Sequence, residues 1–350
     1  MAKLSDIDKN FKVGGIINRE DIEFYNIEDA DKFNVFGVFR ENDHYVRLPG
    51  AVAERVSEGV KRLYKHTAGG RICFKSNSPV VAISATYNDP CKWSNFTMAG
   101  SCGFDLYFNQ EVGQWYRTTY FPPMELEDRF ESSAEIYSNE EKEIIINMPL
   151  YAGINDLYIG VKKGSTLTPV NPYKSDKKVV FYGSSITQGG CASRPGNSYE
   201  AMLSRWFSFD YTNLGFSGSA AGEDIMADYV ADLPMDVFVF DYDHNANTAE
   251  YLEKTHEKMF KKVRAKHPDI PVVFMTRPNQ TSPYAENFKV ILKTYENAKA
   301  AGDKNVYFVS GQDIFNLCDS EACTIDGCHP NDLGFYCMAK CVGEVFKKFF

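Results

Sequence analysis

The chain has 350 residues and a formal net charge of −9, with 44% hydrophobic and 14% aromatic residues. This length exceeds the usual size of one domain and favours two domains, each with enough apolar residues for a buried core. The negative charge and the lack of a Lys/Arg-rich run argue against nucleic-acid binding and favour a neutral, small or carbohydrate-like substrate. No apolar run approaches the ~20 residues of a membrane-spanning helix, so we expect no membrane partner.

The cysteines and the N-terminal residues bear on the compartment. Nine cysteines, an odd number without a framework spacing, favour free thiols in a reducing cytoplasm. Residues 1–6 lack the apolar stretch that is typical of a signal peptide. We therefore expect a cytoplasmic protein, or an extracellular one if a leader has been removed.

The first half of the chain is typical of short strands and turns. Apolar residues alternate there between Gly, Pro and Asn, which predicts an antiparallel, jelly-roll-like β-sandwich over residues 1–170. Strands are expected within 69–87, 100–110, 116–123, 141–151 and 154–164. One helix is expected over 51–64, because its apolar residues recur at helical spacing.

The second half, 171–350, has a different periodicity. The polar segment 165–178 contains two prolines and is expected to be the linker. Beyond it, apolar strands alternate with helical stretches at 248–266 and 284–301, which predicts a parallel sheet covered on both faces. The strands are expected at 178–183, 210–215, 236–242, 271–276 and 305–310. Ligands of such sheets bind beyond the carboxyl ends of the strands, so we expect the chemistry there.

The segment 183–187, GSSIT, stands at the end of the first of these strands. It differs from the G-x-S-x-G elbow of α/β-hydrolases, because Thr187 occupies the position of the final glycine. A serine hydroxyl becomes a nucleophile only beside a base, and six histidines are present to supply one. Of these, His256 and His267 fall on or just after the long helical stretch, where we expect a solvated polar face.

His329 is the histidine best placed to act as the base. Asp326 precedes it by three residues and Pro330 stiffens the backbone behind it. A carboxylate so placed can hold the imidazole with its other nitrogen toward a serine. Taken alone, the segment fits equally well an Asp that caps the last helix beside a solvent-exposed His.

In combination, four segments resemble the SGNH/GDSL hydrolases. That family carries separate blocks at strand ends, matched here by GSSIT, by NLGFSG at 213–218, by DYDHNAN at 241–247 and by DGCHP at 326–330. The resemblance covers about residues 177–350. It implies a three-layer, flavodoxin-like parallel sheet that carries a serine hydrolase.

The resemblance also implies roles for individual residues. Ser185 would be the nucleophile, His329 the general base and Asp326 the residue that orients the base. The oxyanion hole would consist of the backbone N–H groups of Ser185 and Gly218 and the side-chain amide of Asn245. Donors already aimed at the developing negative charge can each contribute roughly 3–4 kcal/mol to catalysis.

The chain departs from the family pattern at two places. Ser184 stands where the family has an Asp beside the nucleophile, which puts the hydrogen bonds of this turn in question rather than the activity. The third block lacks the usual Gly-x-Asn-Asp form, so that Asp243 or His244 could shape the pocket instead of Asn245.

The segment 99–107, AGSCGFDLY, resembles the Gly-x-Asp-Leu-Tyr domain that precedes some bacterial SGNH hydrolases. Chains with this pair of domains resemble carbohydrate O-acetyl esterases. The resemblance therefore implies a serine esterase that acts on acetylated carbohydrates and needs no cofactor. We interpret Gly103, Asp105 and Tyr107 as a tight turn that enters a strand rather than as catalytic residues.

Three aromatic residues of the first half have two interpretations. Trp93, Trp115 and Tyr116 could stack on a sugar or fill the sandwich. Large aromatic side chains are mostly core material, so we favour packing.

A metal site is an alternative for the C-terminal region, where cysteines stand at 318, 323, 328, 337 and 341. Zinc sites usually show tighter Cys-x-x-Cys pairs, and ligation by His329 would consume the proposed base. We therefore expect free buried thiols and no metal.

Two alternative functions are compatible with the same predicted fold. One is a sugar-binding module whose hydrolase half is inactive, and the other is a hydrolase of acyl lipids or thioesters with the same triad. No long apolar lid segment is evident, which disfavours acyl lipids. Whether a second copy of the chain completes the pocket in a homo-oligomer is left open.

Overall fold

The computed structural model describes residues 17, 19–278 and 285–350, and the chain divides into two compact units. The described residues of 1–47, 65–172 and 193–196 form the first unit, and those of 48–64, 173–192 and 197–350 form the second. Each unit thus takes one segment from the other half of the sequence. Residues 1–6, which we considered for a signal peptide, lie outside the described residues. So does Tyr284, the first residue of the helix expected over 284–301.

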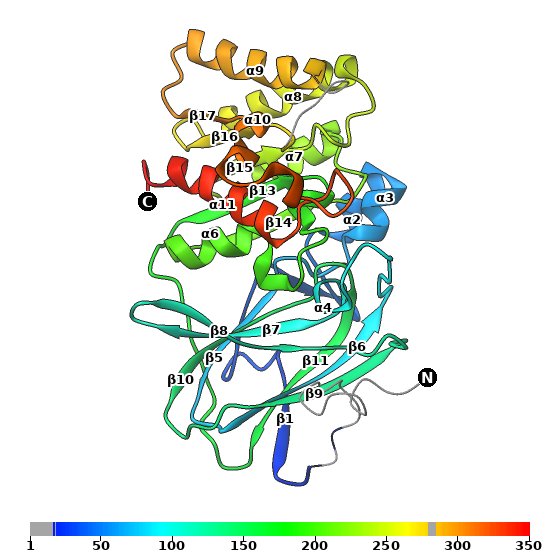
Figure 1. Ribbon diagram of the computed structural model, residues 1–350, viewed down its shortest axis with the longest axis vertical. Coiled ribbons are helices and arrows are strands. Elements are labelled where there is room, and N and C mark those ends of the chain that lie inside the picture. Colours follow the sequence, from blue (N-terminus) through cyan, green and yellow to red (C-terminus); the bar gives the residue numbers. More distant parts are fainter. Residues whose placement is uncertain (1–16, 18, 279–284) are drawn as a thin grey trace. The chain divides into compact units, whose positions relative to one another are not determined.

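Two antiparallel sheets form the first unit (Figure 1). One has the strand order β1 (Ile22–Asn26), β11 (Gly153–Lys162), β6 (Val80–Asn88) and β9 (Arg129–Glu135). The other has the order β12 (Thr168–Pro169), β5 (Arg71–Ser76), β10 (Lys142–Asn147), β7 (Phe104–Gln110) and β8 (Gly113–Tyr120), and β2 (Asn34–Phe36) pairs with β5. A short hairpin joins β3 (Phe39–Glu41) to β4 (His44–Val46), and α4 (Met98–Ser101) precedes β7.

The core of this unit follows from strand alternation. Val81, Ile83 and Ala85 of β6 and Ile144 and Ile146 of β10 all belong to one buried cluster. Successive side chains of a strand point to opposite faces, so residues two apart contribute to the same core. Because the two sheets share this cluster, the predicted antiparallel sandwich is confirmed.

The helix expected over 51–64 is two helices, α2 (Gly50–Val56) and α3 (Glu58–Leu63). The prediction of one continuous helix was wrong because Ser57 is extended, with φ −165°, and its hydroxyl accepts a hydrogen bond from the Val60 N–H at 3.2 Å. A serine that caps the second helix ends the first one. Both helices belong to the second unit, where α2 contacts α7 (Asp224–Asp232).

The second unit contains a five-stranded parallel sheet, which confirms the predicted α/β fold class (Figure 1). Its order is β14 (Asp210–Gly215), β13 (Lys178–Gly183), β15 (Val237–Asp241), β16 (Val272–Met275) and β17 (Val306–Val309). This is the flavodoxin-like order, in which the first strand in sequence lies second from one edge. Every residue of β15 is buried, as expected for a strand covered on both faces.

Helices cover both faces of this sheet. One pair, α6 (Tyr199–Phe207) and α11 (Asp332–Phe346), packs together, and α7, α8 (Ala249–Lys266) and α9 (Ala285–Ala300) pack in sequence order. Right-handed crossovers that run in opposite directions along a sheet place these two sets on opposite faces. None of the described helices combines the length and the apolar character that crossing a bilayer requires.

His256 lies inside the α8 layer and is 1% exposed, so our expectation of a solvated polar face was wrong for it. Its ring stacks on Phe240 of β15, with ring centroids 4.5 Å apart, and its Nδ1 lies 3.0 Å from Thr294 Oγ1. Burial lowers the pKa of His256 to about 3, so the ring is neutral. His267 is half-buried, and its Nε2 lies 3.0 Å from the carbonyl oxygen of Ala231.

Candidate active site

Ser185 opens a short helix at the carboxyl end of β13. The strand ends at Gly183, and α5 (Ser185–Gln188) follows at once. Ser184 caps this helix, because its hydroxyl accepts a hydrogen bond from the Ile186 N–H at 3.2 Å. Its own N–H donates to the Asp241 carbonyl of β15 at 3.2 Å. Ser184 thus fixes the turn without a carboxylate.

The structure brings together the three residues expected to form the triad. Ser185 Oγ lies 2.9 Å from His329 Nε2, and His329 Nδ1 lies 2.8 Å from Asp326 Oδ2. Ser185 is 7% exposed, and the side chains of His329 and Asp326 are 22% and 32% exposed. The three groups form a continuous relay from a carboxylate to a hydroxyl.

A tight loop before α11 produces this geometry. Asp326 Oδ1 accepts hydrogen bonds from the backbone N–H groups of His329, at 2.7 Å, and Cys328, at 3.0 Å. The N–H of Ile325 donates to the carbonyl of His329 at 3.0 Å, and Gly327 takes a left-handed φ of 79°. The loop therefore folds Asp326 back over the residue that it orients.

The charge of Asp326 fixes the tautomer of His329. Burial alone would raise the pKa of Asp326, but the hydrogen bonds from the backbone and ring of His329 outweigh it and hold this pKa at about 2. An ionised carboxylate only accepts hydrogen bonds, so the proton between the two side chains sits on His329 Nδ1. The lone pair of Nε2 then faces Ser185, as a general base requires.

The second and third blocks are tied to the same region of the unit. Asn213 Nδ2 donates to the carbonyl of Thr187 in α5 at 2.6 Å, which joins the end of β14 to the nucleophile helix. Gly218 takes a left-handed φ of 67° in the turn that follows. Asn245 Nδ2 donates to the carbonyl of Phe216 at 3.0 Å, so the third block is anchored to the turn that carries Gly218.

Asp243 and His244 hold neighbouring loops. Asp243 Oδ2 accepts from the N–H of Arg277 at 3.0 Å, its carbonyl accepts from Asn287 Nδ2 at 3.0 Å, and burial raises its pKa to about 6. Burial and then the charge of Arg277 lower the pKa of His244 well below the usual range. His244 is therefore a neutral ring, 3.8 Å from Cys328 Sγ.

Cys191 is a neighbour of the triad that the sequence did not reveal. Its Sγ and the ligand atoms of Asp326 and His329 all lie within 4.8 Å of one another. Burial, followed by the charge of Asp326, raises the pKa of Cys191 to about 12, so the thiol is protonated and a poor competitor for Ser185. Both ring nitrogens of His329 already face partners, which favours a triad over a metal at this trio.

In the first unit, the segment 103–107 leads into β7 and also binds residues that are distant in the sequence. Asp105 is fully buried and accepts hydrogen bonds from Arg194 Nη1 at 2.7 Å, Gly196 N at 2.9 Å and Asn147 Nδ2 at 2.7 Å. Arg194 also donates to the hydroxyl of Tyr107. The motif thus forms hydrogen bonds with a segment that lies between α5 and α6 in the sequence. No local sequence pattern indicates Arg194 as a partner of Asp105.

The three aromatic residues of the first unit are exposed, so our preference for core packing was wrong. Trp93, Trp115 and Tyr116 are 41%, 57% and 47% exposed. Trp115 and Tyr116 lie on β8, the last strand of its sheet. The guanidinium of Arg194 lies 4.1 Å from the ring centroid of Tyr116.

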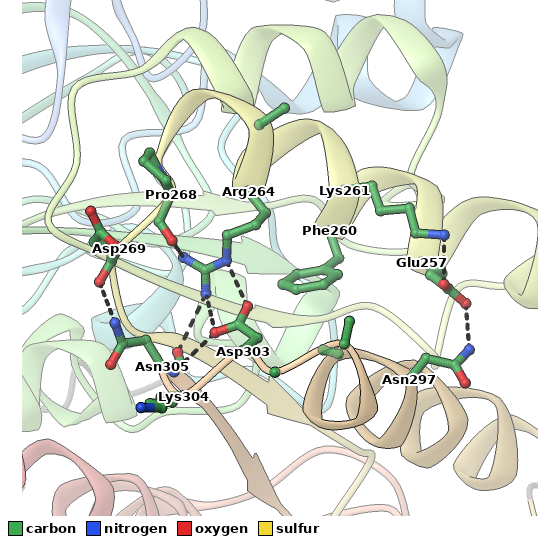
Figure 2. A pocket seen from close by; sticks show the side chains of 14 residues that line it. Glu257, Phe260, Lys261, Arg264, Pro268, Asp269, Asn297, Asp303, Lys304 and Asn305 are labelled. Carbon is green, nitrogen blue, oxygen red and sulfur yellow. Dashed lines mark hydrogen bonds and ion pairs between the residues drawn. The ribbon is translucent and has the colours of Figure 1, made fainter.

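A cavity of about 810 Å³ lies at the opposite end of the parallel sheet, beside the segments that lead into β16 and β17 (Figure 2). Arg264 crosses it and donates to the carbonyl of Pro268 and to the carboxylate of Asp303 (Figure 2). It also donates to the carbonyls of His267 and Ile270. Ligands of open parallel sheets bind at the carboxyl ends of the strands, and this cavity is at the amino ends. We therefore assign it no part in the active site.

Comparisons with known proteins agree with the geometry. Residues 176–347 match the model of the GDSL-like Lipase/Acylhydrolase family, and residues 22–167 match the model of the GxDLY N-terminus of SGNH-hydrolase-type esterases. The chain has no match among curated proteins.

Solved structures extend the likeness over most of the chain. A candidate GDSL-like lipase from Bacteroides ovatus is 29% identical, with 93% of this chain and 97% of that chain covered and a TM-score of 0.83. A salicylyl-acyltransferase from a tetracycline biosynthetic pathway is 17% identical, with 95% and 98% covered and a TM-score of 0.76. An acetyl xylan esterase from the rumen bacterium Butyrivibrio proteoclasticus is 14% identical, with 93% and 98% covered and a TM-score of 0.56. The last two show a shared fold.

Proposed function

Because the chain belongs to the GDSL-like lipase/acylhydrolase family and is a carboxylic ester hydrolase, we propose that it removes short acyl groups, above all O-acetyl groups, from carbohydrates. The observation that carries the mechanism is the relay from Asp326 through His329 to Ser185, with its two contacts of 2.8 and 2.9 Å.

The relay can perform both halves of an ester hydrolysis. Ser185 Oγ attacks the acyl carbonyl while His329 Nε2 takes its proton, and Asp326 stabilises the imidazolium that forms. His329 then gives this proton to the departing sugar hydroxyl, which leaves an acyl group on Ser185. Water then attacks the acyl carbonyl while His329 takes one of its protons. The bond between the acyl carbon and Ser185 Oγ breaks, His329 returns the proton to Ser185, and the acid leaves. No cofactor enters these steps.

The negative charge on the carbonyl oxygen needs donors in fixed positions. We assign this role to the N–H of Ser185, the N–H of Gly218 and the side-chain amide of Asn245. The left-handed turn at Gly218 and the anchoring of Asn245 to Phe216 support the assignment, because both keep a donor in place before substrate arrives. Ser184 supports the first donor by capping α5.

Two observations favour a carbohydrate ester. The exposed rings of Trp93, Trp115 and Tyr116 offer the kind of apolar face on which a sugar ring packs. The acetyl xylan esterase with the same fold is named for an acetylated polysaccharide.

A panel of esters tests the substrate class. Acetate release from acetylated oligosaccharides should exceed hydrolysis of p-nitrophenyl octanoate, with the deacylated hydroxyl located by NMR. A preference for octanoyl over acetyl esters would instead support an acyl-lipid hydrolase, and rapid cleavage of acetyl thioesters alone would support a thioesterase. Oligosaccharide binding without any ester cleavage would support an inactive sugar-binding module.

We place this activity in the cytoplasm. All nine cysteines are free thiols, including three that lie close together, and a reducing compartment preserves such thiols. Recovery of the native protein with disulfide-linked cysteines would argue for an oxidising compartment instead.

A further inference from the structure

Three thiols of the second unit that take no part in the ester chemistry lie in direct contact. Cys318 Sγ is 3.2 Å from Cys323 Sγ and 3.1 Å from Cys337 Sγ. All three sulfur atoms lie within 4.8 Å of one another. Two cysteines suffice for a disulfide, whereas three converging sulfurs make a ligand set.

The elements that carry these thiols follow the pattern of a metal site. Cys318 comes directly after η2 (Phe315–Leu317), and Cys323 comes directly after η3 (Ser320–Ala322). They form a Cys-x4-Cys pair, which is within the spacing of zinc sites, and Cys337 of α11 supplies the third sulfur.

The three cysteines differ in exposure. Cys323 and Cys337 are 0% and 1% exposed, whereas Cys318 is partly exposed. A cation can therefore reach the two inner sulfurs from the side of Cys318.

We propose that Cys318, Cys323 and Cys337 bind a thiophilic divalent cation of the Zn²⁺ class as three thiolates, with the fourth coordination position open toward the exposed side of Cys318. Binding releases three protons and involves no oxidation or reduction. Zinc–sulfur bonds of about 2.3 Å set tetrahedral sulfurs about 3.8 Å apart, so the sulfurs separate by only about 0.6 Å. A disulfide of about 2.05 Å would need two sulfurs to approach by about 1 Å and would exclude the third.

The sequence argued against a metal site because ligation by His329 would consume the proposed base, and these three cysteines avoid that conflict. The ligand set omits His329, whose ring serves Ser185, and it omits Cys328, whose Sγ contacts His244. The carbonyl of Cys323 accepts the N–H of Asn331 at 3.0 Å, so Cys323 and Asn331 close the loop that carries Asp326 and His329. A cation would thus join one end of this loop to α11.

Titration of the reduced, untagged full chain with Co²⁺ tests the proposal. We expect one equivalent to bind with an intense near-ultraviolet sulfur-to-cobalt charge-transfer band, and Zn²⁺ to displace it. The band should be lost in Cys318→Ser and in Cys323→Ser. Cys341→Ser is the matched control, because Cys341 lies one turn beyond Cys337 on α11 and should leave the band unchanged.

A thermal readout keeps the test valid if a variant is less stable. Zn²⁺ should raise the Tm of the wild type and of Cys341→Ser but not that of Cys318→Ser, because a cation that binds only the folded state stabilises it. No charge-transfer band in the wild type, or a band that survives Cys318→Ser, would overturn the proposal. So would a disulfide that joins Cys318 to Cys323 or Cys337 while the reduced chain binds no Co²⁺. None of these readouts depends on ester hydrolysis.

Discussion

The two ends of the parallel sheet both carry clustered polar side chains, but the clusters are built differently. At the carboxyl ends, Ser185, His329 and Asp326 form a chain of contacts that terminates at one hydroxyl. At the amino ends, Arg264 spreads its donors over several carbonyls and the carboxylate of Asp303, inside a cavity of about 810 Å³. The first cluster presents a reactive atom to a substrate, whereas the polar groups of the second form hydrogen bonds with one another. Convergence on one atom, rather than cavity size, indicates where the chemistry occurs.

The comparison predicts that changes at the two ends affect different quantities. Changes at the carboxyl ends should reduce turnover with little effect on the free energy of unfolding. Changes at the amino ends should do the reverse. Three variants separate these effects, beginning with the largest, and a fourth tests a buried ring between the two ends.

Ser185→Ala should lower kcat by about 10⁴- to 10⁶-fold, because the nucleophile is removed while the rest of the pocket stays. Steady-state hydrolysis of p-nitrophenyl acetate measures this. Ser184→Ala is the matched control, since its hydroxyl caps α5 and should cost about 1 kcal/mol of stability with most turnover retained. Equal losses of kcat in the two variants would remove the distinction between these serines.

Arg264→Ala should lower the free energy of unfolding by about 3–5 kcal/mol, because Asp303 is left as a largely buried carboxylate without its partner. Urea unfolding at low temperature measures this loss, and kcat of the folded variant should be unchanged. Lys261→Ala is the control in the same cavity. Lys261 is 71% exposed in its ion pair with Glu257, so the change should cost less than about 1 kcal/mol. Reduced kcat in folded Arg264→Ala would break the contrast between the two ends.

Asn245→Ala should lower kcat by about 10²- to 10³-fold, the loss typical of one oxyanion donor, with a smaller effect on KM. The exposed neighbour Asn247 provides the control, and Asn247→Ala should keep wild-type turnover. A normal kcat in Asn245→Ala would show that the amide only anchors the turn at Phe216.

His256→Phe should change how stability depends on pH. Burial lowers the pKa of His256 to about 3, whereas the pKa of a histidine in the unfolded chain is about 6.5. Between these two pH values the unfolded chain binds a proton on His256 and the folded chain does not. The stability contributed by the neutral ring is complete above pH ~6.5 and is lost as the pH falls toward 3, by about 1.4 kcal/mol per pH unit.

Urea unfolding between pH 6 and pH 4 measures this effect. The wild type should lose about 2–3 kcal/mol more than His256→Phe over this interval. Thr294→Val removes the hydrogen-bond partner but not the titrating ring, and it should keep the wild-type slope. The same slope in His256→Phe and the wild type would contradict the assignment.

The sequence predicts much of the fold because that information is local. β13 and β14 have the predicted bounds, and both end in a glycine that marks the end of the strand in the sequence. Asp326 and His329 stand three residues apart, so their contact could also be anticipated. Ser185, His329 and Asp326 lie together, as their positions in the four sequence blocks suggest. Their catalytic roles stay a proposal.

The rest depends on contacts between residues far apart in the sequence. Arg194 meets Asp105 across 89 positions, and nothing near either residue indicates the pair. Cys337 joins Cys318 only because α11 packs beside the segment that follows η2. Trp115 is hydrophobic, so composition favours burial, but the tertiary structure leaves it 57% exposed. Such features follow from tertiary structure and have no periodic signature.

Covalent labelling with an organophosphonate ester tests the central claim most directly. The reagent imitates the tetrahedral intermediate, so the wild type should gain one adduct per chain, located by peptide mass spectrometry on Ser185. His329→Gln should remain unlabelled over the same period, because the base that activates Ser185 is gone. An adduct on Ser184 or Cys191, or equal labelling of the wild type and His329→Gln, would contradict a serine mechanism driven by His329.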